Sequence, residues 1–451
     1  MFMKILLINP YEADQDGYSS PPLGLAYIAG TLEKFKYDIK IVDGYLVGQK
    51  GIEESIIEYK PEIVGITCYT PGRKKSIEIA RIAKEINKNI ITVIGGAHAT
   101  IMGEQIMNNY SFVDICVYGE GEQTMLEIAQ KNNIRSIDGI YWRYNNKVIK
   151  NKSRHFIDNL DNIPFPSWHL IDMNRYPPIG HEVIDGVDIS SVPRIPVIFS
   201  RGCTGSCNFC STWWVWKGHR TRSVDNMISE LKILVEDKGF KHICFYDDSF
   251  SSDIEKAKQL CKKIVSHGLK FVWSATTRTD CVDNELLELM KMAGCYEIAY
   301  GIESASDTVL KKMKKMANVK DGIAAIKLAK KHKIKTRVMI IIGNDGETKK
   351  TINETVAFLR KTKPDILSYV GNLWVLPGTA LYQKLKKINL INDDFWLGNE
   401  PYFVYPLHSK EDMAKYTFAI SNRIRIGSLR FFLKYYSPCN IIKNKIKLLL
   451  K

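Results

Sequence analysis

The stretch Phe199–Cys210, with the sequence FSRGCTGSCNFC, decides the fold of this chain. Its cysteines, Cys203, Cys207 and Cys210, have the spacing C-x3-C-x2-C. Glycine, serine and asparagine between them let the backbone bend, so we expect the three thiolates to face one point. Three thiolates can ligate three irons of a 4Fe–4S cluster and leave the fourth iron open to a small molecule. The loop therefore predicts an iron–sulfur site that carries out chemistry.

A structural zinc site is the alternative for this loop, but such sites use four ligands at paired C-x2-C or Cys/His spacings. The sequence offers no such partner pair nearby. With Phe209 in the aromatic position, the pattern C-x3-C-x-aromatic-C resembles the signature of the radical S-adenosylmethionine (radical SAM) superfamily. The resemblance implies that the cysteines hold a 4Fe–4S cluster and that Phe209 packs beside the adenine of S-adenosylmethionine.

The size and composition of the chain are those of an ordinary globular protein. Its 451 residues, 45% hydrophobic and 25% charged, suffice for two or three domains. We expect no transmembrane helix, because no run of eighteen apolar residues occurs, and no signal peptide. The other cysteines indicate reduced thiols in the core of a cytoplasmic protein; they are Cys68, Cys116, Cys244, Cys261, Cys281, Cys295 and Cys439.

The net charge is +15, which fits nucleic acid, an anionic membrane surface or an acidic substrate as a partner. We favour lysines spread over solvated helix faces, since net charge informs solubility more than specific function. Residues 391–451 are predicted to form a basic helical region, with ten Lys and Arg after residue 400 against Glu411 and Asp412. A basic amphipathic helix over Asn440–Lys451 fits peripheral membrane contact or plain packing, and the sequence leaves both open.

Residues 1–135 alternate short β-branched strands with helical patterns, and the expected strands are Lys4–Asn9, Asp38–Val42, Ile63–Thr67, Ile90–Ile94 and Asp114–Tyr118. This alternation predicts an α/β fold with a doubly wound, flavodoxin-like parallel sheet of five strands. Such sheets bind ligands at the carboxyl ends of their strands. Glycine-containing turns stand there, over 21–25, 95–100 and 119–122. A dinucleotide site is disfavoured, because no G-x-G-x-x-G follows the first strand.

Together with Asp43, these turns resemble the cobalamin-binding domain that precedes one large class of radical SAM enzymes. The resemblance implies cobalamin contacts from Gly24, Thr67, Gly95, Gly96, His98, Gly119 and Glu120. The D-x-H-x-x-G motif of methionine-synthase-type domains is missing, because the loop Tyr11–Ser20 has no histidine. We therefore expect no protein histidine on cobalt and place His98 near the nucleotide tail of cobalamin. The missing motif also leaves open that the domain has lost the cofactor.

Residues 136–193 are predicted to be a hairpin, over 138–149, and a proline-rich connector anchored by Trp168 and Tyr176. From 194 to 390, strands and helices alternate again. Six βα units predict a partial (β/α)6 barrel whose site lies at the carboxyl ends of the strands. The expected strands are Pro196–Ser200, His242–Tyr246, Lys270–Ala275, Glu297–Tyr300, Thr336–Ile342 and Ile366–Leu373.

Polar residues end the barrel strands: Asp247 and Asp248 the second, Arg278 the third, Glu303 and Ser304 the fourth. The resemblance implies that the aspartates help hold the methionine amino group of S-adenosylmethionine. It implies that Arg278 pairs with the methionine carboxylate or a nearby charge, and that the Glu303–Ser304 end contacts the ribose hydroxyls or the amino group. Helix capping is the alternative for Asp248, Glu303 and Ser304. After the fifth strand, the family's G-x-P-G-E-T is matched only in part, because the proline is missing.

The resemblance extends to about residue 390 and implies a cobalamin-dependent radical SAM enzyme with a 4Fe–4S cluster, S-adenosylmethionine and cobalamin as cofactors. Cleavage of S-adenosylmethionine would give a 5′-deoxyadenosyl radical that takes a hydrogen from an unactivated carbon. We expect methyl transfer to that carbon, with oxidative cyclisation or ring rearrangement as the alternative. We also expect a small-molecule or lipid-like substrate and an electron donor such as flavodoxin or ferredoxin.

Two other functions explain less of the sequence. Methylthiotransfer to RNA calls for extra cluster-binding cysteines in the N-terminal domain, where only Cys68 and Cys116 lie. A basic nucleic-acid- or membrane-binding protein would leave the cysteine loop and the ordered strand ends unexplained, so we expect no nucleic acid partner. The sequence identifies neither the substrate nor a catalytic residue.

Overall fold

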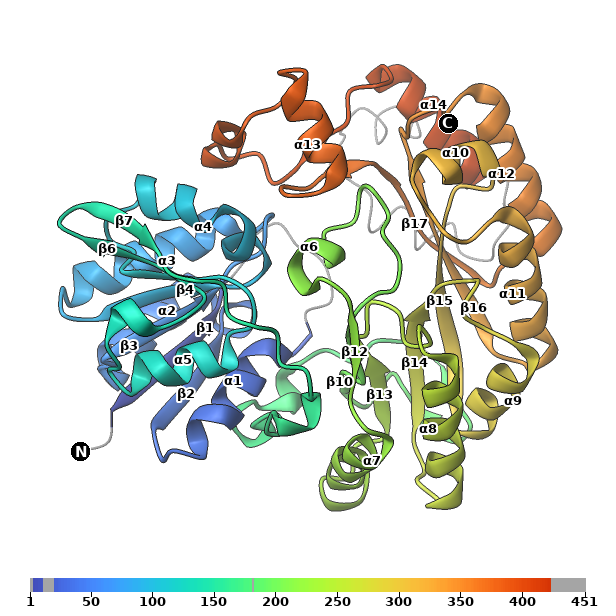
Figure 1. Ribbon diagram of the computed structural model, residues 1–451. Coiled ribbons are helices and arrows are strands. Elements are labelled where there is room, and N and C mark those ends of the chain that lie inside the picture. The colour runs from blue at the N-terminus through green and yellow to red at the C-terminus, as the bar shows by residue number, and fades with distance from the viewer. Residues whose placement is uncertain (1–2, 11–19, 181, 423–451) are drawn as a thin grey trace, which may run out of the picture.

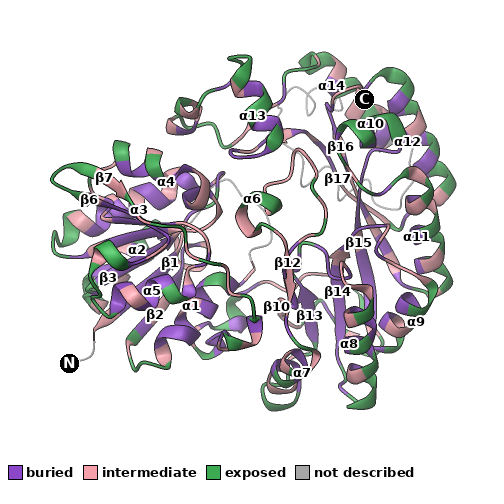
Figure 2. Cartoon of the chain, viewed as in Figure 1, coloured by how far each residue is buried: buried purple, intermediate pink, exposed green. Residues whose placement is uncertain are grey.

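The computed structural model describes residues 3–10, 20–180 and 182–422. Two α/β lobes lie side by side, each built around its own sheet (Figure 1). The central strands of both sheets are buried, while the outward faces of the surrounding helices are exposed (Figure 2). In the described part of the chain, no helix has both the length and the apolar character needed to cross a membrane.

The N-terminal sheet has seven strands in the order β2-β1-β3-β4-β5-β6-β7. Its first five strands are parallel, as predicted: β1 (Lys4–Asn9), β2 (Asp38–Asp43), β3 (Ile63–Thr67), β4 (Ile91–Gly95) and β5 (Ile115–Val117). The hairpin of β6 (Ile140–Tyr144) and β7 (Lys147–Lys150) is antiparallel and adds two strands at the β5 edge. The predicted hairpin is therefore part of this sheet, which is larger than the five strands expected.

Helices cover both faces of this sheet, because side chains of β1 alternate between two cores. Leu6 and Ile8 pack with helices on one face, while Ile5 and Leu7 pack with helices on the other. The first group of helices is α2 (Gly44–Tyr59), α3 (Arg73–Ile86) and α4 (Ala97–Asn109), and the second is α1 (Leu23–Glu33) and α5 (Glu122–Ala129). Helix α4 begins at Ala97, so His98 lies in its first turn.

The second sheet is a parallel, open arrangement of six strands, as the six βα units predicted. Its order follows the sequence: β10 (Arg194–Val197), β13 (His242–Phe245), β14 (Val272–Thr277), β15 (Cys295–Glu303), β16 (Lys335–Ile342) and β17 (Ile366–Asn372). Helices line its outer side (Figure 1); they are α7 (Val224–Lys232), α8 (Ile254–Ser266), α9 (Asn284–Met292), α10 (Asp307–Lys312), α11 (Val319–Lys331) and α12 (Lys349–Thr362).

The strand expected over Pro196–Ser200 is divided in two. β10 ends at Val197, and β11 (Ser200–Gly202) forms a separate antiparallel ribbon with β12 (His219–Thr221). Gly202 has φ +84°, and a Cβ there would lie 1.9 Å from the Gly218 carbonyl oxygen. The ribbon therefore needs glycine at this position, directly before Cys203.

The connector between the lobes is anchored by buried aromatic side chains, as predicted. Trp168 and Tyr176 are 5% and 4% exposed, and the Tyr176 hydroxyl donates to Asp43 at 2.6 Å. The regular elements of the connector are short: η2 (Leu160–Asn162), η3 (Trp168–Leu170), η4 (Met173–Arg175), β8 (Val183–Ile184) and β9 (Val187–Asp188). Another short element, η1 (Ile134–Ser136), precedes the hairpin.

After β17 the chain returns to the N-terminal lobe. Met102 of α4 joins Leu381 and Trp396 in one apolar cluster, and a Cβ on Gly378 would meet the Ile101 side chain at 2.8 Å. This segment contains β18 (Trp374–Val375), α13 (Ala380–Lys387), η6 (Asp393–Leu397), β19 (Phe403–Val404) and α14 (Lys410–Asn422). The basic helix predicted over Asn440–Lys451 lies outside the described residues.

Gly30 and Gly24 of α1 test how the connector packs. A Cβ on Gly30 would lie 2.3 Å from the Phe165 carbonyl oxygen, whereas one on Gly24 would meet nothing within 4 Å. Alanine stabilises a helix by about 1 kcal/mol relative to glycine. Forcing a methyl group into a filled space costs about 1–3 kcal/mol of stability. In urea unfolding, Gly30→Ala should lower the free energy of unfolding by up to about 2 kcal/mol. Gly24→Ala should leave it equal or raise it, and equal effects would contradict the packing described.

Candidate functional site

The cysteine loop begins at the end of β11 and is followed by the short helix α6 (Thr212–Trp216). Cys203, Cys207 and Cys210 are partly exposed free thiols. Burial raises the pKa of Cys207 to about 11 and also raises that of Cys210, and the neighbouring thiols reinforce both shifts. A metal bound here must displace thiol protons, so its affinity rises with pH.

The three thiols are arranged differently from the ligands of a single ion. Among the residues that the structure describes, no three His, Cys, Asp or Glu side chains group as a site for one metal ion requires. That the three thiolates face one point stays a prediction. An iron–sulfur cluster asks for something else, because each cysteine binds its own iron. A donor set of three neighbouring thiols fits that cluster better than a four-ligand zinc site.

Arg278 holds the cysteine loop from the end of β14. Its Nη1 donates to the Thr204 hydroxyl at 2.9 Å, and its Nε donates to Asp280 at 2.9 Å. A Cβ on Gly205 would lie 3.2 Å from Nη1, so the loop backbone passes close to the guanidinium. One side of the Arg278 fork is therefore occupied by Asp280, and the other positions the loop.

The two aspartates after β13 also hold the ribbon that carries the loop. Asp247 is buried and accepts hydrogen bonds from the backbone N–H of Phe199 (3.2 Å) and of Ser200 (2.5 Å) and from the Ser200 hydroxyl (2.5 Å). Asp248 is exposed and accepts from the Gly202 N–H at 3.2 Å and the Thr212 hydroxyl at 2.8 Å. Gly202 precedes the cysteine loop and Thr212 follows it, so the Asp248 carboxylate joins the two ends of the loop.

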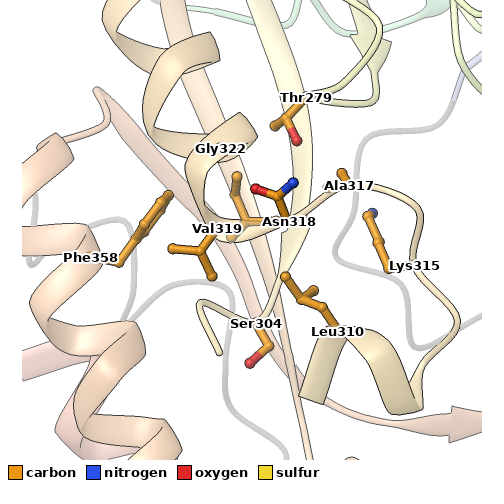
Figure 3. Close-up of a pocket in the computed structure, with 11 residues that line it drawn as sticks. Thr279, Ser304, Leu310, Lys315, Ala317, Asn318, Val319, Gly322 and Phe358 are labelled. Carbon is orange, nitrogen blue, oxygen red and sulfur yellow. The ribbon is translucent and has the colours of Figure 1, made fainter. Parts of the chain in front are cut away.

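Glu303 ends β15 with a left-handed backbone, φ +60°, and its carboxylate pairs with the buried Lys315 ammonium at 2.9 Å. A Cβ on Gly301 would lie 2.3 Å from Glu303 Oε1, so only glycine leaves room for this conformation. Ser304 and Lys315 line a small cavity of about 10 Å³, together with Asn318 (Figure 3). It has room for about one water molecule.

Phe209 projects from the loop toward the C-terminal segment. Its ring packs against the apolar cluster that contains Leu373, Val375 and Leu381. The Asn208 carbonyl accepts from the Leu381 N–H at 2.9 Å, while the Asn208 N–H donates to Met313 at 2.9 Å. The loop is thus fixed from both sides of the barrel opening.

The glycine turns of the N-terminal sheet lie at one edge. Thr67 pairs in register with Gly95, and the Gly119 N–H donates to Thr100 Oγ1 at 3.2 Å. Gly96 has φ +104°, and a Cβ there would lie 2.9 Å from the Cys68 carbonyl oxygen. Gly24 is exposed near the start of α1. The glycines therefore leave backbone accessible at the carboxyl edge of β4 and β5, where a ligand can approach closely.

His98 is enclosed by protein. Its Nδ1 lies 3.1 Å from the Thr70 hydroxyl, and its ring packs edge-on against Trp396 at 6.2 Å. Burial lowers the pKa of His98 to about 3, so the ring is neutral at physiological pH. Above it, the Arg73 guanidinium donates to the Trp396 carbonyl at 2.7 Å and stacks on the Trp396 ring at 5.3 Å. His98 is therefore covered by Trp396 of the C-terminal segment that returns to this lobe.

Glu120 joins the two lobes. Its carboxylate receives the Arg201 guanidinium of β11 at 2.6 Å and the Arg220 guanidinium of β12 at 3.0 Å. Arg201 also pairs with Glu122 at 2.5 Å. Neither arginine was predicted as a site residue, although Arg201 lies two residues before Cys203 in the cysteine loop. No local pattern marks the partner of a buried arginine.

Two family models match the chain: a B12 binding domain over residues 14–129 and the radical SAM superfamily over residues 197–359. An uncharacterised methyltransferase of Pyrococcus horikoshii is 34% identical over 408 residues, which are 87% of this chain and 85% of that protein. The chain belongs to the cobalamin-dependent radical SAM family. The predicted family and its cofactors, cobalamin, a 4Fe–4S cluster and S-adenosylmethionine, are thereby confirmed.

Further relatives of this radical SAM protein differ in their reactions. The anaerobic magnesium-protoporphyrin IX monomethyl ester cyclase of Rubrivivax gelatinosus is 30% identical, over 96% of this chain and 78% of the cyclase. The methyltransferase TsrM of Kitasatospora setae, solved with cobalamin and a 4Fe–4S cluster, superposes with a TM-score of 0.71 at 18% identity, over 86% of this chain and 75% of TsrM. OxsB, solved with aqua-cobalamin and S-adenosylmethionine, superposes with a TM-score of 0.67 at 19% identity. The match covers 90% of this chain and 57% of OxsB. These two superpositions confirm the fold.

Cys203, Cys207 and Cys210 should be required for both iron binding and cleavage of S-adenosylmethionine. Anaerobic reconstitution should load about four irons per chain and allow reductive cleavage of S-adenosylmethionine. Replacement of all three cysteines by alanine should abolish both, because no thiolates remain to hold the irons. Iron analysis and chromatography of 5′-deoxyadenosine measure this, with Cys261→Ala as a buried-thiol control. Retained cleavage in the triple variant would refute the assignment of the cluster.

Asp247 predicts a pH-dependent stability of the cofactor-free chain. Burial raises its pKa from 3.8 to about 6, against the lowering effect of the Ser200 hydrogen bonds. The folded state therefore holds this proton more tightly than the unfolded state. The associated stability, about 3 kcal/mol, is present below pH 4 and is lost as pH rises through 6.

Asp247→Asn isolates this effect, because the amide does not titrate. Urea unfolding between pH 4 and 7 should show the wild type losing stability relative to the variant up to about pH 6, with a constant difference above. Curves that stay parallel across this window would show that Asp247 is not the group responsible.

Proposed function

We propose that this chain methylates an unactivated carbon of a small-molecule or lipid-like substrate as a cobalamin-dependent radical SAM enzyme. One observation carries the proposal: the carboxyl edge of the B12-binding sheet and the cysteine loop are joined directly by the Arg201 ion pairs with Glu120 and Glu122. Two cofactor sites held against each other suit a reaction in which one activates the carbon and the other supplies the methyl group. The cofactors supply that chemistry when bound, and the chain supplies placement.

The residues take the following proposed roles. Cys203, Cys207 and Cys210 hold the cluster. Phe209, Asp248, Glu303 and Ser304 face S-adenosylmethionine, and Gly24, Thr67, Gly95, Gly96 and Gly119 line the cobalamin face of the N-terminal sheet. Arg278 and Asp247 position the loop through Thr204 and Ser200. His98 supports the cobalamin side from beneath, as a neutral ring.

Methyl transfer is favoured over cyclisation by similarity. The Pyrococcus relative named a methyltransferase is 34% identical, against 30% for the Rubrivivax cyclase. The cyclase remains the second candidate, because it covers 96% of this chain. Both reactions begin with hydrogen abstraction, so they differ in whether a methyl group joins the substrate.

Exposed aromatic side chains beside the loop support an apolar substrate. Helix α6 follows Cys210 directly, and its Trp213 and Trp214 are 43% and 40% exposed. Tyr246, at the carboxyl end of β13, is 40% exposed. Large apolar surfaces left open near a site are typical of ligand contacts. We also propose a cytoplasmic location and a flavodoxin- or ferredoxin-like electron donor.

Labelled cofactor tests the reaction type. The reconstituted enzyme would be incubated anaerobically with methyl-labelled S-adenosylmethionine, a reductant and an extract of small metabolites and lipids. Mass spectrometry should find a product that gains one labelled methyl, with 5′-deoxyadenosine and S-adenosylhomocysteine formed in equal amounts. A product that loses hydrogens without gaining carbon, and without S-adenosylhomocysteine, would instead establish oxidative cyclisation.

A further inference from the structure

Four buried charged side chains form a cluster between the lobes, which we call the interdomain ion cluster: Arg201, Arg220, Glu120 and Glu122. Their side chains are only 2–14% exposed. Two guanidinium groups face two carboxylates, so the formal charges balance. Burying such a set costs desolvation that its attraction barely offsets, and apolar replacements are often at least as stable. The cluster is therefore poorly explained by stability alone.

The geometry of Arg201 fixes both the position and the orientation of its partner turn. Nη1 binds Glu120 and Nη2 binds Glu122, on either side of Gly121. A planar fork that binds two separate carboxylates tolerates little rotation. The guanidinium is also stacked between two rings, with its centre 5.5 Å from Tyr27 of α1 and 5.4 Å from Trp216 of α6.

The second strand of the ribbon is held to the same turn. Arg220 lies opposite Arg201 in the ribbon, binds Glu120, and donates to the Ile157 carbonyl of the connector at 2.7 Å. Glu120 in turn accepts from the Ile157 N–H at 2.7 Å. Both strands that bracket the cysteine loop are thus tied to one turn of the B12-binding domain.

The covalent path from this cluster to both cofactor sites is short. Arg201 is separated from Cys203 only by Gly202, whose backbone conformation is restricted by Gly218. Glu120 directly follows Gly119, at the carboxyl end of β5. Because these connections are short and restricted, a shift of the Arg201 guanidinium would move the cysteine loop relative to the corrinoid-binding edge by a similar distance.

We propose that Arg201 is a positioning residue that sets the placement of the cysteine loop against the B12-binding edge through Glu120 and Glu122. This inference rests on the proposed function, because only a reaction that uses both cofactors needs this registration. The proposal predicts different effects of an Arg201 substitution on two activities. Cleavage of S-adenosylmethionine needs the barrel alone, whereas methyl transfer from S-adenosylmethionine to reduced cobalamin needs both lobes in place.

The test compares Arg201→Gln, Arg201→Lys and Glu122→Gln with the wild type in the reconstituted holoenzyme, without substrate. 5′-Deoxyadenosine should stay within about threefold of the wild type, while S-adenosylhomocysteine formed with reduced cobalamin should fall roughly 10²-fold for Arg201→Gln, as for a misplacement of about 1 Å. Arg201→Lys, which keeps the charge and loses the fork, should recover part of the loss. Glu122→Gln keeps the shape of the site and serves if Arg201→Gln fails to fold.

Amide hydrogen exchange on the cofactor-free chain gives a readout independent of activity. Exchange should quicken in 119–122 and 200–202 of the variants and stay unchanged in β14 and β15. The matched control is Arg337→Gln, which breaks the Arg337–Glu297 pair (2.7 Å) between β16 and β15 and should alter neither the product ratio nor those segments.

Three results would overturn the proposal: equal loss of both products, unchanged products, or unchanged exchange at the two segments. A wild type that cleaves S-adenosylmethionine but never forms S-adenosylhomocysteine would instead remove the proposed methyl transfer. In that case the exchange comparison still decides whether Arg201 positions the loop.

Discussion

The contact between one guanidinium of β11 and two carboxylates after β5 organises the whole molecule. Ligand sites in parallel α/β sheets lie at the carboxyl ends of the strands, so each lobe by itself presents a site at one edge. The Arg201 ion pairs bring these two edges into contact. Because the charges are buried, a broken pair would leave an uncompensated charge in the interior, so the pairs hold one geometry.

The polar side chains at the ends of the barrel strands hold the cysteine loop in place through hydrogen bonds within the protein. Asp247 and Asp248 bind the backbone of the ribbon, and Arg278 binds Thr204. A loop of glycine and serine has little structure of its own, so its shape must come from such outside contacts. The cysteine loop is thereby held in place by side chains from two neighbouring strand ends, those of β13 and β14.

The C-terminal segment has a comparable role on the cobalamin side. Trp396 packs against His98 and accepts a hydrogen bond from Arg73, which lies 323 positions away in the sequence. A histidine in such surroundings stays neutral and serves packing, which agrees with the missing ligand motif in the first loop. The same segment contacts the cysteine loop through Leu381. It therefore packs on both lobes.

The sequence by itself determined the strands, the parallel sheets and the cysteine loop, because hydrophobic periodicity and glycine spacing are local properties. It did not show that the hairpin extends the first sheet, that the strand before the loop is divided, or that Glu120 pairs with Arg201. The ion pairs join residues that lie 79 to 81 positions apart in the sequence. The place of the hairpin depends on which sheet edge is free to pair with it. A buried charge or an open edge is satisfied by whatever the fold brings near, and only the tertiary structure decides which group that is.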